Sequence, residues 1–358
     1  MKNLFEMFSR KPESGHLEVP KNLDLTRGEY SESELPKQIS EAEDISYVPV
    51  DVLETASFDT NFNWPKKLPE GFDPEKLMEE DKNPGLGVRE LHNEGITGKG
   101  VVVAIIDQKI APTHVEFKDN LICNNEYRDG KPEGIEETTS MHGPAVASLL
   151  VGKTCGVAPD AQLYYCAAMS DENNFLGNIR ALKEIIKYNE TADNKIRIVS
   201  VSKGSQKVPG LKEWLEVKEK AREVGITVVD SDYFAANSVT GGGSKKDKDQ
   251  FDNYDFPLFY KGKKPSSKRD EIIVPSDYRT MASRQGDNEY RHDAEGGWSW
   301  AIPYFSGIFA LALQVRPDLR DKEFLDIVKK TAGRNKDGVA VINPKGIIEE
   351  VKGMVSKT

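Results

Sequence analysis

The segment GVVVAIID (residues 100–107) decides the fold class of this 358-residue chain. It is a run of apolar, mostly β-branched residues that ends in a carboxylate, Asp107. Such a run is typical of a strand that is buried on both faces, as the strands of a parallel sheet are. We therefore predict a central strand here, with Asp107 at its carboxyl end.

Helical and strand patterns alternate on the carboxyl side of this segment. Apolar residues recur at helical spacing in some stretches and form short unbroken runs in others. Helices are predicted at 142–152, 178–190 and 211–224, and strands at 162–168, 196–202 and 225–230. This alternation predicts an α/β fold with a mostly parallel central sheet flanked by helices on both faces.

The two ends of the chain differ in composition. Residues 1–80 are polar and rich in Glu, Lys and Pro, so we expect an N-terminal extension that is regulatory or partly disordered. Residues 81–358 carry the alternating pattern and are predicted to form the main domain. Within it, the stretch at about 231–270 shows no steady period and is predicted to be a long irregular insertion.

Charge and composition narrow the function classes. The net charge of -10 and the pI near 5.3 argue against binding to nucleic acid, which needs clustered Lys and Arg. The first residues lack the apolar core of a secretory signal, and no apolar run is long enough to span a bilayer. We therefore expect a cytoplasmic protein with no membrane partner, whose oligomeric state the sequence leaves open. Cys123, Cys155 and Cys166 have no disulfide or zinc spacing and are expected to be reduced.

Three side chains have the chemistry of nucleophilic catalysis. Asp107 ends a strand, His142 begins a predicted helix, and Ser299 begins an apolar helix within GGWSWAIPYFSG (296–307). An imidazole oriented by a carboxylate can take the proton of a hydroxyl and make it a nucleophile. Each residue has an ordinary alternative role, because a strand-end Asp often caps a turn and a Ser often caps a helix.

Three blocks of sequence favour the catalytic role of these residues over the ordinary roles. GKGVVVAIIDQKIAPTHVEF, then HGPAVASLLVG with GVAPDAQLYYCAA, and GGWSWAIPYFSG resemble, in this order, the signature blocks of the subtilisin-like serine peptidases, or subtilases. The resemblance implies a subtilisin-like three-layer sandwich and a serine endopeptidase that hydrolyses peptide bonds. It also implies Asp107 as the orienting acid, His142 as the general base and Ser299 as the nucleophile.

A further stretch, VSVSKGS (199–205), resembles the subtilase strand that lines the substrate cleft. Ser202, Lys203 and Gly204 are therefore candidates to pair with an extended peptide or protein substrate. For Lys203, an ordinary position in a loop after a strand is an equal alternative. No cofactor is expected, and structural calcium, which family members often bind, cannot be assigned to residues.

The oxyanion donor is harder to place. Subtilases usually carry an asparagine a few residues after the strand that residues 225–230 resemble. Counting from this strand reaches Tyr233 or Phe234, neither of which is an amide. Asn237 is the candidate oxyanion donor if the loop is longer.

The surroundings of the predicted nucleophile depart from the family pattern. Trp298 and Trp300 stand where subtilases usually have Thr and Met, and Pro303 is expected in the first turn of the helix, where a missing N–H costs little. The alternative hypothesis is a catalytically inactive pseudopeptidase that binds peptides or proteins. An esterase is less consistent with the sequence, because the G-x-S-x-G motif is absent. Residues 1–80 are either a regulatory segment that is removed or a linker.

Overall fold

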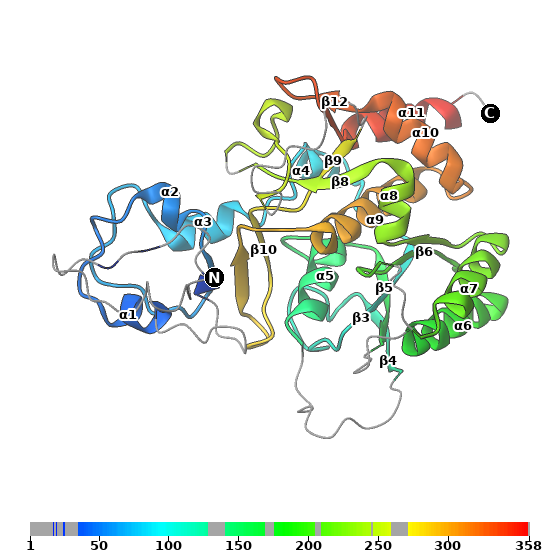
Figure 1. Cartoon of the computed structure of the whole chain (residues 1–358). Helices are drawn as coiled ribbons and strands as arrows, with labels where there is room; N and C mark the ends of the chain where they lie inside the picture. The colour runs from blue at the N-terminus through cyan, green and yellow to red at the C-terminus, as the bar shows by residue number, and fades with distance from the viewer. Residues whose placement is uncertain are drawn as a thin grey trace.

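Three β-sheets and the helices around them make up the fold (Figure 1). We describe it from a computed structural model. The structure describes residues 17, 19, 24–25, 35–127, 140–168, 175–204, 209–244, 246–258 and 271–356.

The central sheet has five strands in the order β4-β5-β3-β6-β7, and every neighbouring pair is parallel. Its strands are β3 (Val102–Asp107), β4 (Leu121–Glu126), β5 (Gln162–Ala167), β6 (Ile196–Ser200) and β7 (Thr227–Val229). The middle strand β3 thus lies within the apolar segment 100–107, and all six residues of the strand are buried.

Alternate side chains of β3 enter two different hydrophobic clusters, one on each face of the sheet. One face packs with α5 (His142–Val151) and α9 (Trp298–Val315). The other face packs with α6 (Leu176–Thr191) and α7 (Leu211–Glu223). Helices therefore cover both faces of a parallel sheet, which confirms the predicted fold class (Figure 1).

A second sheet has the strand order β12-β13-β9-β8. Part of it lies in the stretch predicted to be irregular, which contains α8 (Ser231–Asn237) and β8 (Val239–Gly242). The regular structure in this stretch, which was predicted to be irregular, has two causes. Asp230 caps α8 by accepting a hydrogen bond from the Tyr233 N–H at 2.9 Å. β8 forms by pairing with β9 (Ile272–Pro275), a distant segment that a local pattern cannot indicate.

The remaining elements belong to residues 81–358. They are α4 (Val88–Asn93), η2 (Phe251–Asn253), α10 (Asp321–Thr331), β12 (Gly333–Arg334), β13 (Ala340–Val341) and α11 (Pro344–Val355). By length and composition α9 could cross a membrane, but 78% of it is buried inside the protein. It is therefore a central core helix, and its first turn carries Ser299.

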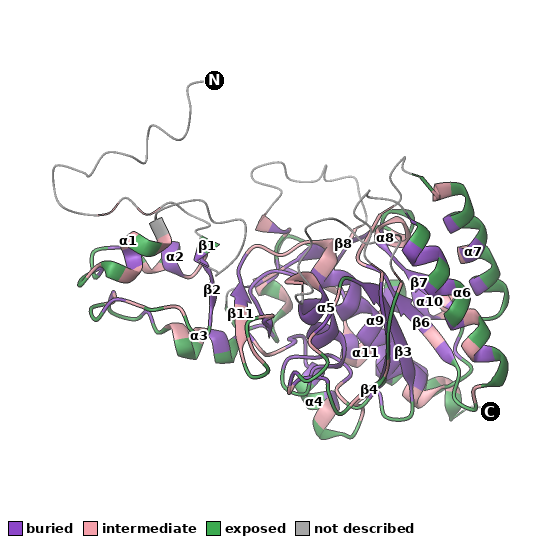
Figure 2. Cartoon of the chain, turned by 90° about the horizontal axis from the view of Figure 1, so that it is seen from below, coloured by how far each residue is buried: buried purple, intermediate pink, exposed green. Residues whose placement is uncertain are grey.

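The N-terminal part of the chain contributes to the third sheet, β1-β2-β11-β10 (Figure 2). Its elements are β1 (Asp24–Leu25), α1 (Leu35–Glu41), α2 (Val50–Leu53), β2 (Ser57–Asp59) and α3 (Pro74–Glu80), and they meet β10 (Arg279–Ala282) and β11 (Tyr290–Asp293). These elements enclose a hydrophobic cluster of their own, with Ile39, Leu53 and Phe58 at its centre. The division of the chain near residue 80 stays a prediction.

Candidate active site

Asp107 and His142 form a direct hydrogen bond. The imidazole Nδ1 of His142 lies 2.7 Å from Oδ1 of Asp107. The same Oδ1 accepts a hydrogen bond from the Gln108 N–H at 2.7 Å, which orients the carboxylate at the end of β3. The structure thus brings together two of the three residues that the sequence predicts for the catalytic triad, from β3 and from the first residue of α5.

A glycine lets α5 approach the end of β3 this closely. A Cβ atom at Gly143 would lie 2.4 Å from the carbonyl oxygen of Gln108 and 2.7 Å from that of Lys109. Ser140 fixes the approach, because its hydroxyl donates to the Lys109 carbonyl at 3.1 Å and accepts from the Gly143 N–H at 3.1 Å. The first turn of α5 is therefore held against the residue pair that follows Asp107.

The environment of His142 favours its protonated form. Burial opposes a charge on the imidazole, but the negative charge of Asp107 and the hydrogen bond to it outweigh burial and raise the pKa of His142. The side chain of His142 is 20% exposed, whereas that of Asp107 is 5% exposed. An imidazole that is partly accessible and backed by a buried carboxylate has the arrangement of a general base.

Ser299 is the second residue of α9, after the N-cap residue Gly297. Pro303 lies in the second turn of the helix, not in the first as expected, and its missing N–H leaves the carbonyl of Ser299 without its helical donor. The hydroxyl of Ser202 takes this place and donates to the Ser299 carbonyl oxygen at 2.9 Å. The predicted substrate strand and the predicted nucleophile are thus directly connected.

The two tryptophans that surround Ser299 have defined partners. The ring of Trp300 packs against the His142 imidazole, with centroids 5.1 Å apart. The indole N–H of Trp298 donates to the hydroxyl of Thr240 at 3.3 Å. Trp300 therefore brings the start of α9 beside the Asp107–His142 pair. Both tryptophans depart from the family pattern, and the sequence alone indicates no role for either.

Helix α8 occupies the region where an oxyanion amide was expected. The aromatic ring of Phe234 contacts the ring of Trp298 at a centroid distance of 6.1 Å. Asn237 lies at the last position of α8, and its side-chain amide donates to the Tyr233 carbonyl at 2.8 Å. Helix α8 thus packs the ring of Phe234 against Trp298, the residue before Ser299. One N–H of the Asn237 amide is used in a hydrogen bond within its own helix.

The segment Ser202–Gly204 follows directly after β6. It lies beside the start of α8, since a Cβ at Gly204 would be 3.2 Å from the Cβ of Ser231. The ammonium group of Lys203 lies 4.6 Å from the ring centre of Phe175. Burial lowers the pKa of Lys203, although the charge of Asp107 acts in the opposite direction. A cation therefore stands near the predicted triad.

His, Cys, Asp and Glu side chains are the groups that most often hold metal ions in proteins. Among the parts of the chain that the structure describes, no group of three or more of these side chains is placed to hold a metal ion. The three cysteines are free thiols.

Comparison with known proteins shows similarity to the Subtilase family and to bacterial proteases. Residues 98–255 match the model of the Subtilase family, a range that includes Asp107 and His142 but ends before Ser299. The chain is 26% identical to the minor extracellular protease Epr of Bacillus subtilis, over 86% of this chain and 47% of that protein. It is 30% identical to the major intracellular serine protease of the same organism, over 39% of this chain and 44% of that protein. The chain spans about half the length of these relatives.

Solved structures show the same fold at low identity. The A-subunit of the AB5 toxin from E. coli is 17% identical and superposes with a TM-score of 0.56, covering 75% of this chain and 98% of that chain. The PatG macrocyclase in complex with peptide is 16% identical with a TM-score of 0.54, covering 75% of this chain and 96% of that chain. These similarities support the subtilisin-like three-layer arrangement.

Proposed function

Since this chain is a distant, subtilase-like protein, we propose that it is a serine endopeptidase that hydrolyses peptide bonds through Ser299. The observation that carries this proposal is the 2.7 Å hydrogen bond between His142 and Asp107, beside the start of the helix that bears Ser299. A carboxylate that orients an imidazole, together with a hydroxyl that can give its proton to that imidazole, are the groups that make a serine nucleophilic.

Each residue has one role in the proposed reaction. His142 takes the proton of the Ser299 hydroxyl as the oxygen attacks the substrate carbonyl, and later gives the proton to the leaving amine. Asp107 orients the imidazole and stabilises its charged form. The acyl-enzyme on Ser299 is then hydrolysed by water, which His142 activates in the same way. The net reaction consumes one water molecule for each peptide bond.

The first turn of α9 supplies the donors for the oxyanion. The first N–H groups of a helix have no partner within it, and the positive end of the helix dipole lies there. The N–H of Ser299 belongs to this group, because Ser299 is the second helical residue. We assign the oxyanion to this backbone donor, with Asn237 as the proposed second donor through the N–H that it does not share with Tyr233.

An extended peptide is the proposed substrate. The main chain of Ser202–Gly204 follows the buried strand β6, which ends at Ser200, and is joined to Ser299 by the Ser202 hydroxyl. Main chain that continues from a strand in this way can pair with an extended substrate backbone by main-chain hydrogen bonds. That the protein acts in the cytoplasm, without nucleic-acid, membrane or cofactor partners, is part of the same proposal.

A second function is favoured by one observation, the contact between Phe234 and Trp298. Phe234 of this pair lies in the stretch after β7, where subtilases usually carry the oxyanion asparagine. An oxyanion donor accounts for about 10² to 10³ in turnover, so its loss could leave a peptide-binding protein without activity. The alternative is therefore an inactive pseudopeptidase that uses the same cleft.

Reaction with a fluorophosphonate probe distinguishes the two functions. We expect the folded protein to be labelled on Ser299, and Ser299→Ala and His142→Ala to abolish labelling. Ser306→Ala serves as the control, because Ser306 lies in the same helix and is fully buried. Absence of labelling in the folded wild-type protein would overturn the peptidase and leave the binding protein.

A further inference from the structure

The N-terminal part of the chain is built into the strand that leads to Ser299. β2 pairs antiparallel with β11, with Phe58 opposite His292 and Asp59 opposite Arg291. β11 ends at Asp293, and the chain then runs directly into the Gly297 cap of α9. The segment thus supplies β2, an inner strand of this sheet. The neighbouring strand β11 leads into α9, the helix that carries Ser299.

A second connection lies at the end of this strand. The hydroxyl of Ser57 donates to Oδ1 of Asp293 at 2.6 Å, and both residues are buried. Asp59, also on β2, lines a small pocket together with Met141, the residue before His142. Strand β2 therefore contacts the end of β11, which leads to the predicted nucleophile, and shares a pocket with the residue before the predicted base.

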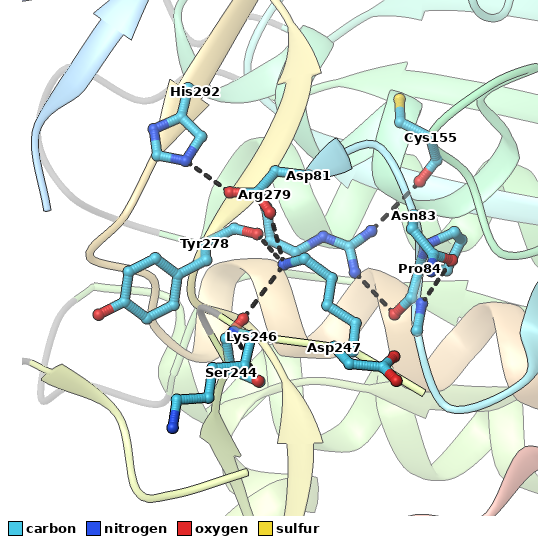
Figure 3. Close-up of polar contacts among 12 residues, drawn as sticks. Asp81, Asn83, Pro84, Cys155, Ser244, Lys246, Asp247, Tyr278, Arg279 and His292 are labelled. Carbon is cyan, nitrogen blue, oxygen red and sulfur yellow. Dashed lines mark hydrogen bonds and ion pairs between the residues drawn. The ribbon is translucent and has the colours of Figure 1, made fainter. Parts of the chain in front are cut away.

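A buried polar cluster anchors the end of the same segment (Figure 3). Asp81 follows α3, and its carboxylate accepts from His292 Nε2 at 2.7 Å and pairs with the Lys248 ammonium at 3.1 Å. Exposed fractions are 4% for Asp81, 7% for Lys248 and 0% for His292. Because buried charges are tolerated only when they are paired, these contacts hold the segment firmly to the rest of the protein.

The pKa shifts of Asp81 and Lys248 agree with this pairing. Burial opposes the charge of Asp81, but Lys248 and His292 outweigh it and lower the pKa of Asp81. Burial lowers the pKa of Lys248, and the charge of Asp81 acts against this shift. Each partner thus stabilises the ionised form of the other.

The junction between the segment and the main domain is buried as well. The guanidinium group of Arg279 donates to the Pro84 carbonyl at 3.0 Å and to the Cys155 carbonyl at 3.2 Å (Figure 3). The Leu86 N–H donates to the Lys248 carbonyl at 2.8 Å. Exposed, flexible segments are the preferred sites of proteolytic cleavage, and this junction has the opposite character.

We propose that residues 57–81 are a permanent part of the folded peptidase, and that Asp81 is a positioning residue that holds β11, and through it Ser299, in place. The segment is then neither a removable blocking peptide nor a linker. This inference rests on the proposed function only for its effect on Ser299, because the retention of the segment is a property of the fold.

The first test is limited proteolysis of the full chain followed by native mass spectrometry, and it needs no activity. We expect the resistant core to retain residues 57–81, as one chain or as an associated fragment. A stable core that lacks any part of this range would overturn the proposal. If fluorophosphonate labels the wild-type protein, the labelled species is expected to retain the same residues.

The second test is Asp81→Asn, which keeps the shape of the side chain and removes its charge. We expect kcat to fall roughly 10- to 100-fold with little change in KM, because small misplacements of reacting groups have effects of this size. Asp73→Asn is the matched control at the exposed N-cap of the same helix, where Asn and Asp serve equally. An unchanged kcat in Asp81→Asn would contradict the positioning role.

Rescue separates the paired charge from a general loss of stability. Asp81→Asn combined with Lys248→Met removes both charges of this ion pair, so the Lys248 ammonium is not left without its carboxylate. We expect the double variant to recover kcat relative to Asp81→Asn alone. Recovery of the melting temperature without recovery of kcat would contradict the role of the pair in positioning Ser299, because the lost activity would then not follow from the unpaired Lys248. If the wild-type protein carries no peptidase activity, the proposed function fails while the proteolysis result still decides whether the segment is permanent.

Discussion

The hydroxyl of Ser202 donates a hydrogen bond to the carbonyl oxygen of Ser299 at 2.9 Å. This carbonyl has no helical donor, because the residue four positions later is Pro303. A missing N–H in α9 is thus compensated by a side chain from the predicted substrate strand. The consequence is that the segment expected to bind substrate also fixes the backbone of the expected nucleophile.

Removal of this hydroxyl is the first prediction. In Ser202→Ala the Ser299 carbonyl loses its protein donor, which costs about 1–3 kcal/mol where the group is shielded from water. We expect a lower melting temperature and a lower kcat, measured by thermal unfolding and peptide hydrolysis. Ser306→Ala is the control, because the Ser306 hydroxyl bonds to the Ile302 carbonyl, which keeps its regular helical donor. Equal effects on kcat in the two variants would contradict this account.

The acid limb of the pH profile is the second prediction. His142 must be neutral to act as a base, and its pKa is raised by Asp107 against the effect of burial. Activity is therefore expected to fall as the pH drops through this raised pKa. Asp107→Asn should move the limb to lower pH and reduce kcat by about 10⁴. The measurement is kcat/KM against pH for both proteins, and a limb that does not move in the variant would show that Asp107 does not set the pKa.

The third prediction concerns the removal of the Trp300 ring. Because it is buried against His142, Trp300→Ala should cost about 3–5 kcal/mol of unfolding free energy and should slow fluorophosphonate labelling of the molecules that remain folded. Trp214→Ala is the matched control, since Trp214 is equally buried but stacks on Phe175 on the other face of the sheet. We expect it to lower stability without slowing labelling. Similar labelling rates in the two variants would refute a specific role of Trp300.

A buried carboxylate near the nucleophile helix leads to the fourth prediction. Burial raises the pKa of Asp277 from 3.8 to about 6, while its hydrogen bonds from Leu258, Ser276 and Gly296 act in the opposite direction. The folded state therefore binds this proton more tightly than the unfolded state.

The sign of the effect follows directly. The contribution of Asp277 to stability is full below pH 3.8 and is lost as the pH rises through about 6, a difference of about 3 kcal/mol. We expect the unfolding free energy of the wild-type protein to rise, relative to Asp277→Asn, as the pH is lowered from neutral toward 4. Denaturant unfolding at several pH values measures it. A constant difference between the two proteins would exclude the proposed titration.

The fifth prediction concerns the oxyanion. If Asn237 contributes a donor, Asn237→Ala should reduce kcat by about 10² to 10³ with little change in KM. Because the bond to Tyr233 uses only one N–H of the amide, we expect a loss near the lower end of this range, about 10²-fold. Steady-state kinetics measures it. A loss of less than about 10-fold would exclude Asn237 as the second donor and leave the Ser299 N–H as the proposed oxyanion donor.

Local sequence was sufficient for the central sheet and for the helix starts that carry His142 and Ser299. The apolar run that ends in Asp107 is typical of a strand buried on both faces, so a parallel sheet was predicted from it. The structure shows His142 and Ser299 at helix starts. These signals lie within one element, where side-chain periodicity is preserved. The roles of His142 and Ser299 in a triad came from the resemblance to subtilases and stay a prediction.

Only the tertiary structure decided how these elements act on one another. Ser57 and Asp293 are separated by 236 positions, yet they share a hydrogen bond, and no pattern in either segment indicates the other. The same holds for Trp298 with Thr240, and for Asp81 with Lys248 and His292. Sequence determines which faces must be buried, because that depends on local polarity. Which partners bury them depends on packing between distant segments, and here that packing joins the N-terminal segment to the strand before Ser299.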